Sequence, residues 1–250
     1  RGHVLEWIDE GGAPATGPAS TDETGSEREV AHSAWLGVDW QDDALQTRAI
    51  LESAMPDWLV VDHYALDVRW ERAAVPRQSG TRLLVIDDLA DREHNCDVLI
   101  DQNLGREASH YGDLVPADAV VRTGPGHALL RPEFLAWRSR SLARHRGVEM
   151  PLRVLLFMGG MDKDDVCGQV LDELWNAAPA GELEFTIVLS SKAPAIERVV
   201  ARARELPFPA TVLTDVSNMA ELMAGTDLAI GAAGSTAWER CCLGLPALLV

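Results

Sequence analysis

The sequence lacks the signatures of several common nucleotide-binding and redox proteins. It contains neither a G-x-x-x-x-G-K-[ST] loop nor a G-x-G-x-x-G turn, so the two best-known phosphate-binding loops are excluded. Its four cysteines, at positions 96, 167, 241 and 242, form no C-x-x-C pair. We therefore expect reduced thiols in a cytoplasmic protein, and no metal or other cofactor.

Basic charge and long apolar runs are also scarce. Lysine and arginine number 22 against 39 acidic residues, which gives a net charge of −17. This balance argues against a nucleic-acid or anionic-membrane partner, because both favour a basic face. No run approaches the roughly 20 apolar residues of a membrane span. A small anionic ligand is still compatible with the sequence, since helix N-termini and a few arginines bind phosphate locally.

What is present is a globular composition, with 47% hydrophobic residues over 250 positions. This length suits one large or two ordinary domains. Residues 11–29 are rich in Gly, Pro, Ser, Thr and acidic residues, which predicts a mobile loop. The sequence begins without Met and stops inside a predicted strand, so we expect a fragment lacking both ends.

Short apolar runs that end in polar residues recur in the first half. Residues 58–61 lead into Asp62, His63 and Tyr64, and similar runs occupy 81–86, 97–100 and 119–121. Buried parallel strands deliver side chains to a site in this way, at their carboxyl ends. A helix is predicted over 42–53, and further helical structure up to Ser79. The pattern indicates an α/β sheet.

The second half follows the same scheme. A predicted strand at 152–158 runs into the turn Gly159-Gly160-Met161-Asp162 and a helix over about 165–176. Further strands are expected at 184–190 and 210–213, with a helix at 195–205 between them. This alternation predicts a Rossmann-like domain. We place the boundary near 148–151, which gives domains 1–148 and 149–250.

The stretch from Ser217 to Val250 reads as helix, strand, glycine-rich turn, helix and strand. Residues 231–236 form the turn, and the helix that opens there offers N–H groups to an anion. Glu239 is predicted in the first turn of that helix, where its carboxylate could meet a diol. Helix capping is the alternative, because Thr236 with Glu239, and Asn218 with Glu221, both fit the capping-box spacing.

Four segments carry a resemblance to a known family: VDHY at 61–64, VIDDLADREHNCDVLIDQN at 85–103, GPGHALLRPEF at 124–134, and the stretch 217–250. Over roughly residues 31–250 the chain resembles the UDP-sugar hydrolases of pseudaminic acid biosynthesis, within the GT-B superfamily. The resemblance implies two Rossmann-like domains facing each other across a cleft, the first incomplete and the second truncated here. It also implies hydrolysis of a UDP-linked 2,4-diacetamido-2,4,6-trideoxy sugar at the anomeric carbon.

The resemblance also implies the site residues. Tyr64 is expected to be catalytic, with Asp62 and His63 beside it, and the general-base histidine is expected upstream of this fragment on a G-x-G-H loop. The residues implied on the UDP side are Arg131, Gly159, Gly160, Asn218, Met219, Gly234, Ser235, Thr236 and Glu239. The expected protein is a monomer whose partner is the small-molecule substrate.

Other interpretations remain open from the residues alone. The same fold suits a glycosyltransferase that uses a UDP-sugar donor, or a nucleotide-sugar-binding module without catalysis. Tyr64 could be a packing residue, His63 and His94 surface or capping residues, and the aspartates at 87, 88 and 91 the solvated part of a turn. The arginines at 131, 138, 140, 144 and 146 could form the solvated face of an interdomain linker helix.

Overall fold

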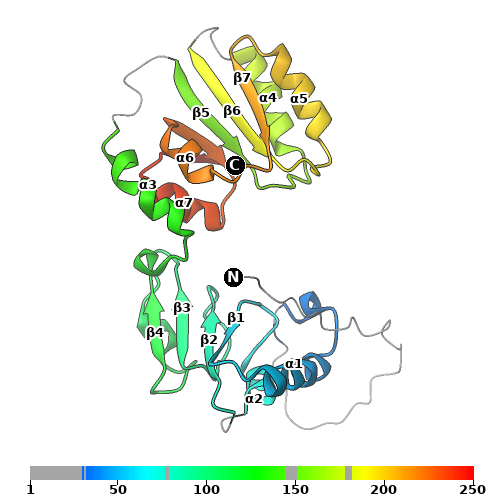
Figure 1. Ribbon diagram of the computed structural model, residues 1–250, viewed down its shortest axis with the longest axis vertical. Helices are drawn as coiled ribbons and strands as arrows, with labels where there is room; N and C mark the ends of the chain where they lie inside the picture. Colours follow the sequence, from blue (N-terminus) through cyan, green and yellow to red (C-terminus); the bar gives the residue numbers. More distant parts are fainter. Residues whose placement is uncertain (1–29, 31, 77–78, 145–150, 178–181) are drawn as a thin grey trace. The chain divides into compact units, whose positions relative to one another are not determined.

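The computed structural model describes residues 30, 32–76, 79–144, 151–177 and 182–250 (Figure 1). The chain divides into two compact units, Arg1–Ala128 and Leu129–Val250, which we call unit 1 and unit 2 and describe one at a time. The division falls earlier in the chain than the predicted boundary near 148–151. The predicted loop at 11–29 lies outside the described residues. The predicted facing of two domains across a cleft stays a prediction.

Unit 1 is built on four parallel strands in the order β1-β2-β3-β4. The strands are β1 (Trp58–Val61), β2 (Arg82–Ile86), β3 (Val98–Asp101) and β4 (Val120–Thr123). The helices are α1 (Trp40–Ala54) and α2 (Val68–Ala74), with short 3-10 helices η1 (Ser33–Leu36), η2 (Ala108–Tyr111) and η3 (Pro125–His127). All four strands predicted from the apolar runs are present.

Carboxylate caps fix the starts of both α-helices in unit 1. Asp39 accepts the N–H of Gln41 at 2.8 Å before α1, and Asp67 accepts the N–H of Arg69 at 2.9 Å before α2. Helix α2 ends at Ala74, short of the predicted Ser79. Pro76 follows, and proline has no N–H with which to continue a helix.

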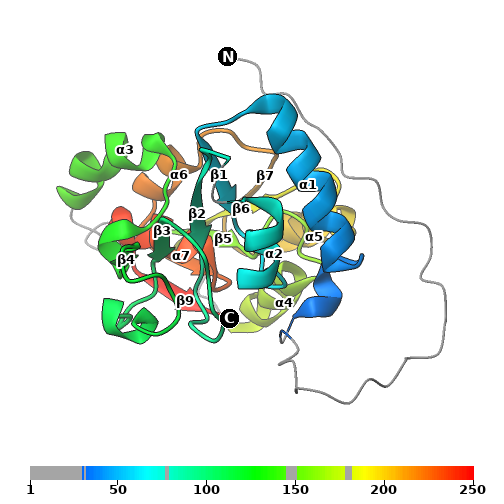
Figure 2. The same cartoon turned by 90° about the horizontal axis from the view of Figure 1, so that it is seen from below.

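The core of unit 1 lies on one face of its sheet. Helices α1 and α2 lie side by side over that face (Figure 2), where the side chains of Val61, Val85 and Leu99 are buried. Val60, on the other face of β1, is 56% exposed. The prediction that β1 is a buried strand is therefore wrong for this face. The reason is that the described helices pack against the other face of this sheet.

Unit 2 has five parallel strands in the order β7-β6-β5-β8-β9, which is the Rossmann order. The strands are β5 (Leu152–Phe157), β6 (Leu183–Leu189), β7 (Ala210–Thr214), β8 (Leu228–Gly231) and β9 (Ala247–Leu249). The helices are α3 (Pro132–Leu142), α4 (Val166–Ala177), α5 (Ile196–Glu205), α6 (Met219–Ala224) and α7 (Ser235–Cys242). The predicted Rossmann-like domain is confirmed.

Helices cover both faces of the unit 2 sheet (Figure 1). Leu156 and Ile187 pack on one side with residues of α4 and α5. Leu155 and Val188 pack on the other side with residues of α3 and α6. Among the residues that the structure describes, none of the helices combines the length and apolar character that a membrane crossing requires.

Arg138 in α3 and Arg144 just after it bind other parts of unit 2, so the interpretation as a solvated linker face is wrong for these two arginines. Arg144 donates to Asp227 Oδ1 at 2.6 Å, and Arg138 donates to the carbonyl of Cys242. Arg140 lies over the ring of Trp137. Arg146 lies outside the described residues. The contacts of Arg138 and Arg144 attach α3 to the rest of unit 2.

Candidate functional site

The two glycine-rich turns of unit 2 are brought together by the sheet topology. Gly159 and Gly160 follow β5, and the turn leading to Gly234 follows β8. Strands β5 and β8 are neighbours, with Phe157 opposite Gly231. The order of the strands reverses between β5 and β8, and α/β sheets bind ligands at such a switch point, outside the carboxyl ends of the strands. The sequence predicted each turn separately, and the strand order places them at the ends of two neighbouring strands.

A pocket of about 240 Å³ lies at the carboxyl ends of β5, β6 and β7. Three of the predicted site residues line it: Arg131, Gly160 and Met219. The remaining lining residues are Phe157, Val188, Leu189, Ser190, Asp215 and Val216. Apolar walls with a few polar groups are typical of small-molecule sites.

Arg131 connects this pocket to Glu239. The Nη2 atom of Arg131 lies 3.3 Å from Glu239 Oε1, and its Nη1 atom lies 3.1 Å from Glu133 Oε1. Burial raises the pKa of Glu239, and the neighbouring Arg131 guanidinium opposes this rise. One guanidinium is thus shared by two carboxylates, although Arg131 and Glu239 are far apart in the sequence.

The start of α7 is free of side-chain caps. Its N-cap is Gly234, with φ at 118°, and no side chain there accepts a helix N–H. The helix begins at Ser235, so Glu239 lies in the second turn. The first-turn prediction for Glu239 is wrong, and the capping box with Thr236 is not formed. Uncapped N–H groups at a helix start favour an anion.

The second capping box is also absent. Asn218 precedes α6, but its side chain accepts no helix N–H; it donates to Glu221 Oε2 at 2.9 Å. Asn218 lines a different pocket, together with Glu184 and Thr186. The structure therefore places Asn218 beside the predicted site but not in the pocket that Met219 lines.

Sequence reasoning missed Arg240, which supports the turn after β8. Its side chain is buried and donates to the carbonyl of Ala232 at 2.8 Å. A Cβ at Gly231 would come within 2.6 Å of the Arg240 Nη1 atom and 2.8 Å of the carbonyl oxygen of Phe157. Gly231 therefore has to be glycine for this arginine to fit. The sequence signal that could have indicated this role is the spacing, because Arg240 follows Thr236 by one helical turn.

The turn after β5 requires glycine for a different reason. Gly159 has φ at +91°, a conformation that side chains disfavour. Asp162, at the end of the turn, accepts the N–H groups of Val166 and Cys167 at 2.9 Å each. Its carboxylate is therefore used to begin α4, whereas the side chain of Met161 is exposed.

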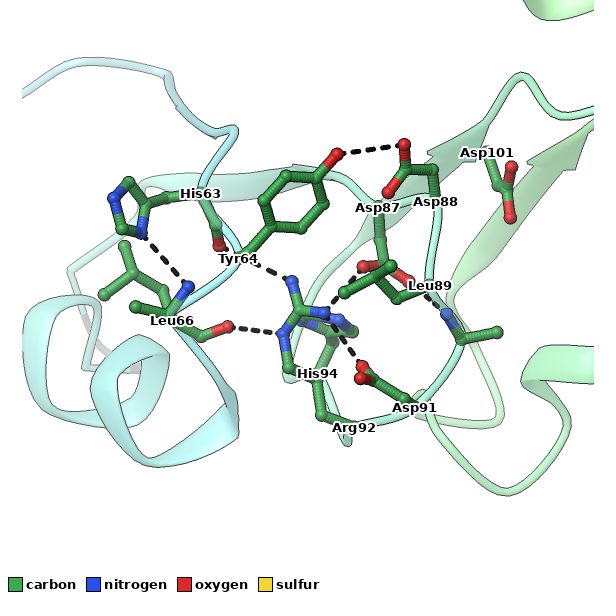
Figure 3. A network of polar contacts seen from close by, with 12 residues as sticks. His63, Tyr64, Leu66, Asp87, Asp88, Leu89, Asp91, Arg92, His94 and Asp101 are labelled. Atoms are coloured by element: carbon green, nitrogen blue, oxygen red, sulfur yellow. Dashed lines mark hydrogen bonds and ion pairs between the residues drawn. The ribbon is translucent and has the colours of Figure 1, made fainter. Parts of the chain in front are cut away.

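In unit 1, Tyr64 meets a carboxylate from the next strand (Figure 3). Its hydroxyl donates to Asp88 Oδ2 at 3.0 Å, and its ring contacts those of His32 and Trp35. Burial, with the Asp88 contact second, raises the pKa of Tyr64. A half-buried ring whose hydroxyl is satisfied fits the packing alternative as well as a role in a site, so the catalytic role of Tyr64 stays a prediction. Asp62 is exposed beside it.

His63 is half-buried, and its ring is committed to a backbone contact. Nδ1 accepts the N–H of Ala65 at 3.1 Å (Figure 3). The neutral ring therefore carries its proton on Nε2. Because neither nitrogen then offers a free lone pair, this arrangement does not suit a general base.

A buried network underlies Tyr64. The hydroxyl of Tyr111 lies 2.8 Å from carboxylate oxygens of both Asp87 and Asp101. Arg92 lies 2.8 Å from Asp87, and Arg106 lies 2.5 Å from Asp101. Asp87 is 2% exposed, so its interpretation as a solvated turn residue is wrong. Burial alone would raise the pKa of Asp87, but the Ala90 N–H, Arg92 and Tyr111 lower it.

His94 is also buried, which corrects its interpretation as a surface or capping residue. Its Nδ1 atom lies 2.7 Å from Oε1 of Glu71, a carboxylate within α2. The second oxygen of Glu71 accepts the N–H of Asn95. This pair ties α2 to the segment that follows β2.

The arginines of this network were not predicted. Besides Asp87, Arg92 binds the carbonyl of Leu66 at 2.8 Å, which ties the β2 end to the segment after β1 (Figure 3). The available signal was that Asp87 and Asp101 both follow apolar runs directly. Nothing in the local sequence marks Arg92 or Arg106 as their partners.

No family model matches the chain. Among curated proteins, the chain is similar to the UDP-2,4-diacetamido-2,4,6-trideoxy-beta-L-altropyranose hydrolase of Campylobacter jejuni, with 30% identity over 165 residues, 66% of this chain and 55% of that protein. It is 26% identical over 145 residues to the spore coat polysaccharide biosynthesis protein SpsG of Bacillus subtilis, covering 56% of this chain and 41% of that protein. The chain thus spans about half the length of these relatives. The resemblance predicted from the motifs is confirmed.

Among solved structures, the chain is similar to MurG of Acinetobacter baumannii. The TM-score is 0.52 with 17% identity, over 84% of this chain and 57% of that one. This likeness concerns the fold alone. It confirms an α/β fold with parallel sheets, of the GT-B type.

Proposed function

We propose that this protein hydrolyses a UDP-linked 2,4-diacetamido-2,4,6-trideoxy sugar at the anomeric carbon and releases UDP and the free sugar for pseudaminic acid biosynthesis. The observation that carries the proposal is the site in unit 2, where the two glycine-rich turns flank the β5–β8 switch point and Arg131 holds Glu239 there. The similarity to the Campylobacter jejuni hydrolase supports the sugar and the reaction.

Each part of the unit 2 site has a task in this function. The uncapped N–H groups at the start of α7, together with Arg131, stabilise the diphosphate that leaves. The apolar walls of the pocket suit the nucleobase. Glu239 accepts hydrogen bonds from the ribose diol. When it does so, the diphosphate replaces Glu239 as the partner of Arg131.

In unit 1, Tyr64 acts on the sugar. It stands at the carboxyl end of β1 with its hydroxyl held by Asp88. Water attacks the anomeric carbon, and the C–O bond to UDP breaks. Holding the sugar so that water is in line is the contribution expected of such positioning groups.

Calorimetry with UDP tests the unit 2 site. A charge-assisted hydrogen bond contributes about 1.5–3 kcal/mol, so Glu239→Ala should weaken UDP binding roughly ten- to a hundredfold. Glu173→Ala is the matched control, because Glu173 is an exposed glutamate of α4. Unchanged UDP affinity in a folded Glu239→Ala variant would contradict the assignment.

A second assay separates the hydrolase from its alternatives. UDP release from the nucleotide sugar by the intact enzyme should proceed in water, without an acceptor. Release that requires an added acceptor would indicate a glycosyltransferase. UDP binding without any turnover would indicate a binding module.

A further inference from the structure

The buried network of unit 1 fixes the main chain of Asp88. The carbonyl of Asp88 accepts hydrogen bonds from Asn103 Nδ2 at 2.9 Å and from Arg106 Nη2 at 2.8 Å. The preceding residue, Asp87, is held by Arg92 and by the N–H of Ala90. Residues at the ends of strands β2 and β3 therefore fix the position of the Asp88 main chain, from which its side chain extends.

The side chain of Asp88 depends on Tyr64. Its Oδ2 atom accepts the Tyr64 hydroxyl at 3.0 Å. Its Oδ1 atom is buried and meets no hydrogen-bond donor among the residues that the structure describes. The nearby guanidinium groups are engaged elsewhere, Arg92 with Asp87 and Arg106 with Asp101. A buried carboxylate oxygen without a donor is costly, so the contact with Tyr64 should be strongly held.

The direction of this hydrogen bond decides what Tyr64 can offer a ligand. A phenol has one proton, and here the proton points at Asp88. The lone pairs of the oxygen are then directed away from Asp88. A carboxylate neighbour also keeps the phenol neutral. Tyr64 is therefore arranged to accept a hydrogen bond, and not to donate a proton to a leaving group.

We propose that Asp88 is a positioning residue, which orients the Tyr64 hydroxyl so that its oxygen accepts a hydrogen bond from a hydroxyl or amide N–H of the bound sugar. The role toward the sugar rests on the proposed function. The pairing of Tyr64 with Asp88 does not, because it can be measured without substrate.

The pairing is tested by NMR of protein labelled at the tyrosine Cζ atom. The sequence contains two tyrosines, so the Tyr64→Phe variant assigns both signals. In Asp88→Asn and Asp88→Ala, Tyr64 should titrate at a lower pH than in the wild type. Asp91→Asn, which changes an exposed carboxylate of the same loop, should leave the titration unchanged. An unaltered Tyr64 titration in the folded Asp88 variants would overturn the proposal.

The role in positioning is tested by a double-mutant cycle in the intact enzyme. Asp88→Asn and Tyr64→Phe should each lower kcat/KM for UDP-sugar hydrolysis by about tenfold or more, with UDP inhibition unchanged. The double variant should lose no more than Tyr64→Phe alone, because the two residues act as one. Losses that multiply would overturn the proposal. Absence of UDP release by the wild type would refute the proposed function, and the titration would still decide the pairing.

Discussion

The sheets of the two units are both parallel, but they differ in how they are covered. In unit 2, helices lie on both faces, and three consecutive β5 residues, 154–156, are each at most 3% exposed. In unit 1, the described helices cover one face, and Val60 and Val120 on the other are 56% and 42% exposed. Parallel sheets are normally buried on both faces. An apolar run therefore identifies a strand, but it does not tell whether both faces are covered.

The largest expected effect comes from the doubly covered sheet. Leu156→Ala should lower the free energy of unfolding by about 2–5 kcal/mol, because Leu156 is fully buried against α4 and α5. Leu84→Ala, on the uncovered face of β2, should cost less, since Leu84 is only half-buried. Urea unfolding followed by circular dichroism measures both. Equal losses would show that the second face of unit 1 is covered in solution.

The units also differ in what lies at their strand ends: unit 1 has a buried polar network, and unit 2 has an open pocket. Tyr111→Phe should lower the free energy of unfolding by about 1–3 kcal/mol, because it removes the hydroxyl shared by two buried carboxylates. Tyr64→Phe is the matched comparison and should lower the free energy of unfolding by less, because Tyr64 is half-buried and its hydroxyl serves one carboxylate, that of Asp88. A larger loss in Tyr64→Phe would contradict this division between a structural tyrosine and a site tyrosine.

Most of the fold could be predicted from the sequence because its signals are local. Apolar runs and breaks at Gly and Pro marked the strands, and the alternation with helices predicted a Rossmann-like domain for unit 2, whose strand order confirms it. Whether helices pack on both faces of a sheet is not decided by the local sequence of a strand, so the exposure of Val60 could not be predicted. The contacts that hold α3 against the rest of unit 2 could not be predicted either, because the partner of Arg144 is Asp227, in another part of the chain.

The candidate site was predictable only where the resemblance supplied it. Arg131 and Glu239 were predicted separately, but their contact joins residues more than a hundred positions apart. Arg92, Arg106 and Tyr111 were missed because their partners lie on other strand ends. The capping boxes are the opposite case, in which a local pattern predicts a contact that is absent. The spacing of Thr236 and Glu239 fits a cap that the structure does not form.

The smallest expected effect is a difference in pH dependence between the units. The pKa of Asp87 in unit 1 lies below its ordinary value of 3.8, so its contribution to stability is present above that pH and is lost as the pH falls through the lowered pKa. The pKa of Glu239 in unit 2 lies above its ordinary value of 4.5, so its contribution is present below that pH and is lost as the pH rises through the raised pKa. The two groups therefore act with opposite signs.

Unfolding free energies measured from about pH 3 to 7 test this difference. The effect is small, because one group can change the slope of the unfolding free energy against pH by at most the equivalent of about one proton. Asp87→Asn should reduce the loss of stability below pH 3.8, because Asn cannot take up the proton. This change in pH dependence is expected at any overall stability of the variant. Glu239→Gln should remove a loss of stability above pH 4.5. Adding UDP makes the test of Glu239 sharper. If Arg131 leaves Glu239 for the diphosphate, saturating UDP should change how the unfolding free energy depends on pH in the wild type and not in Glu239→Gln. A slope that UDP changes equally in both proteins would show that Glu239 is not the group coupled to the nucleotide.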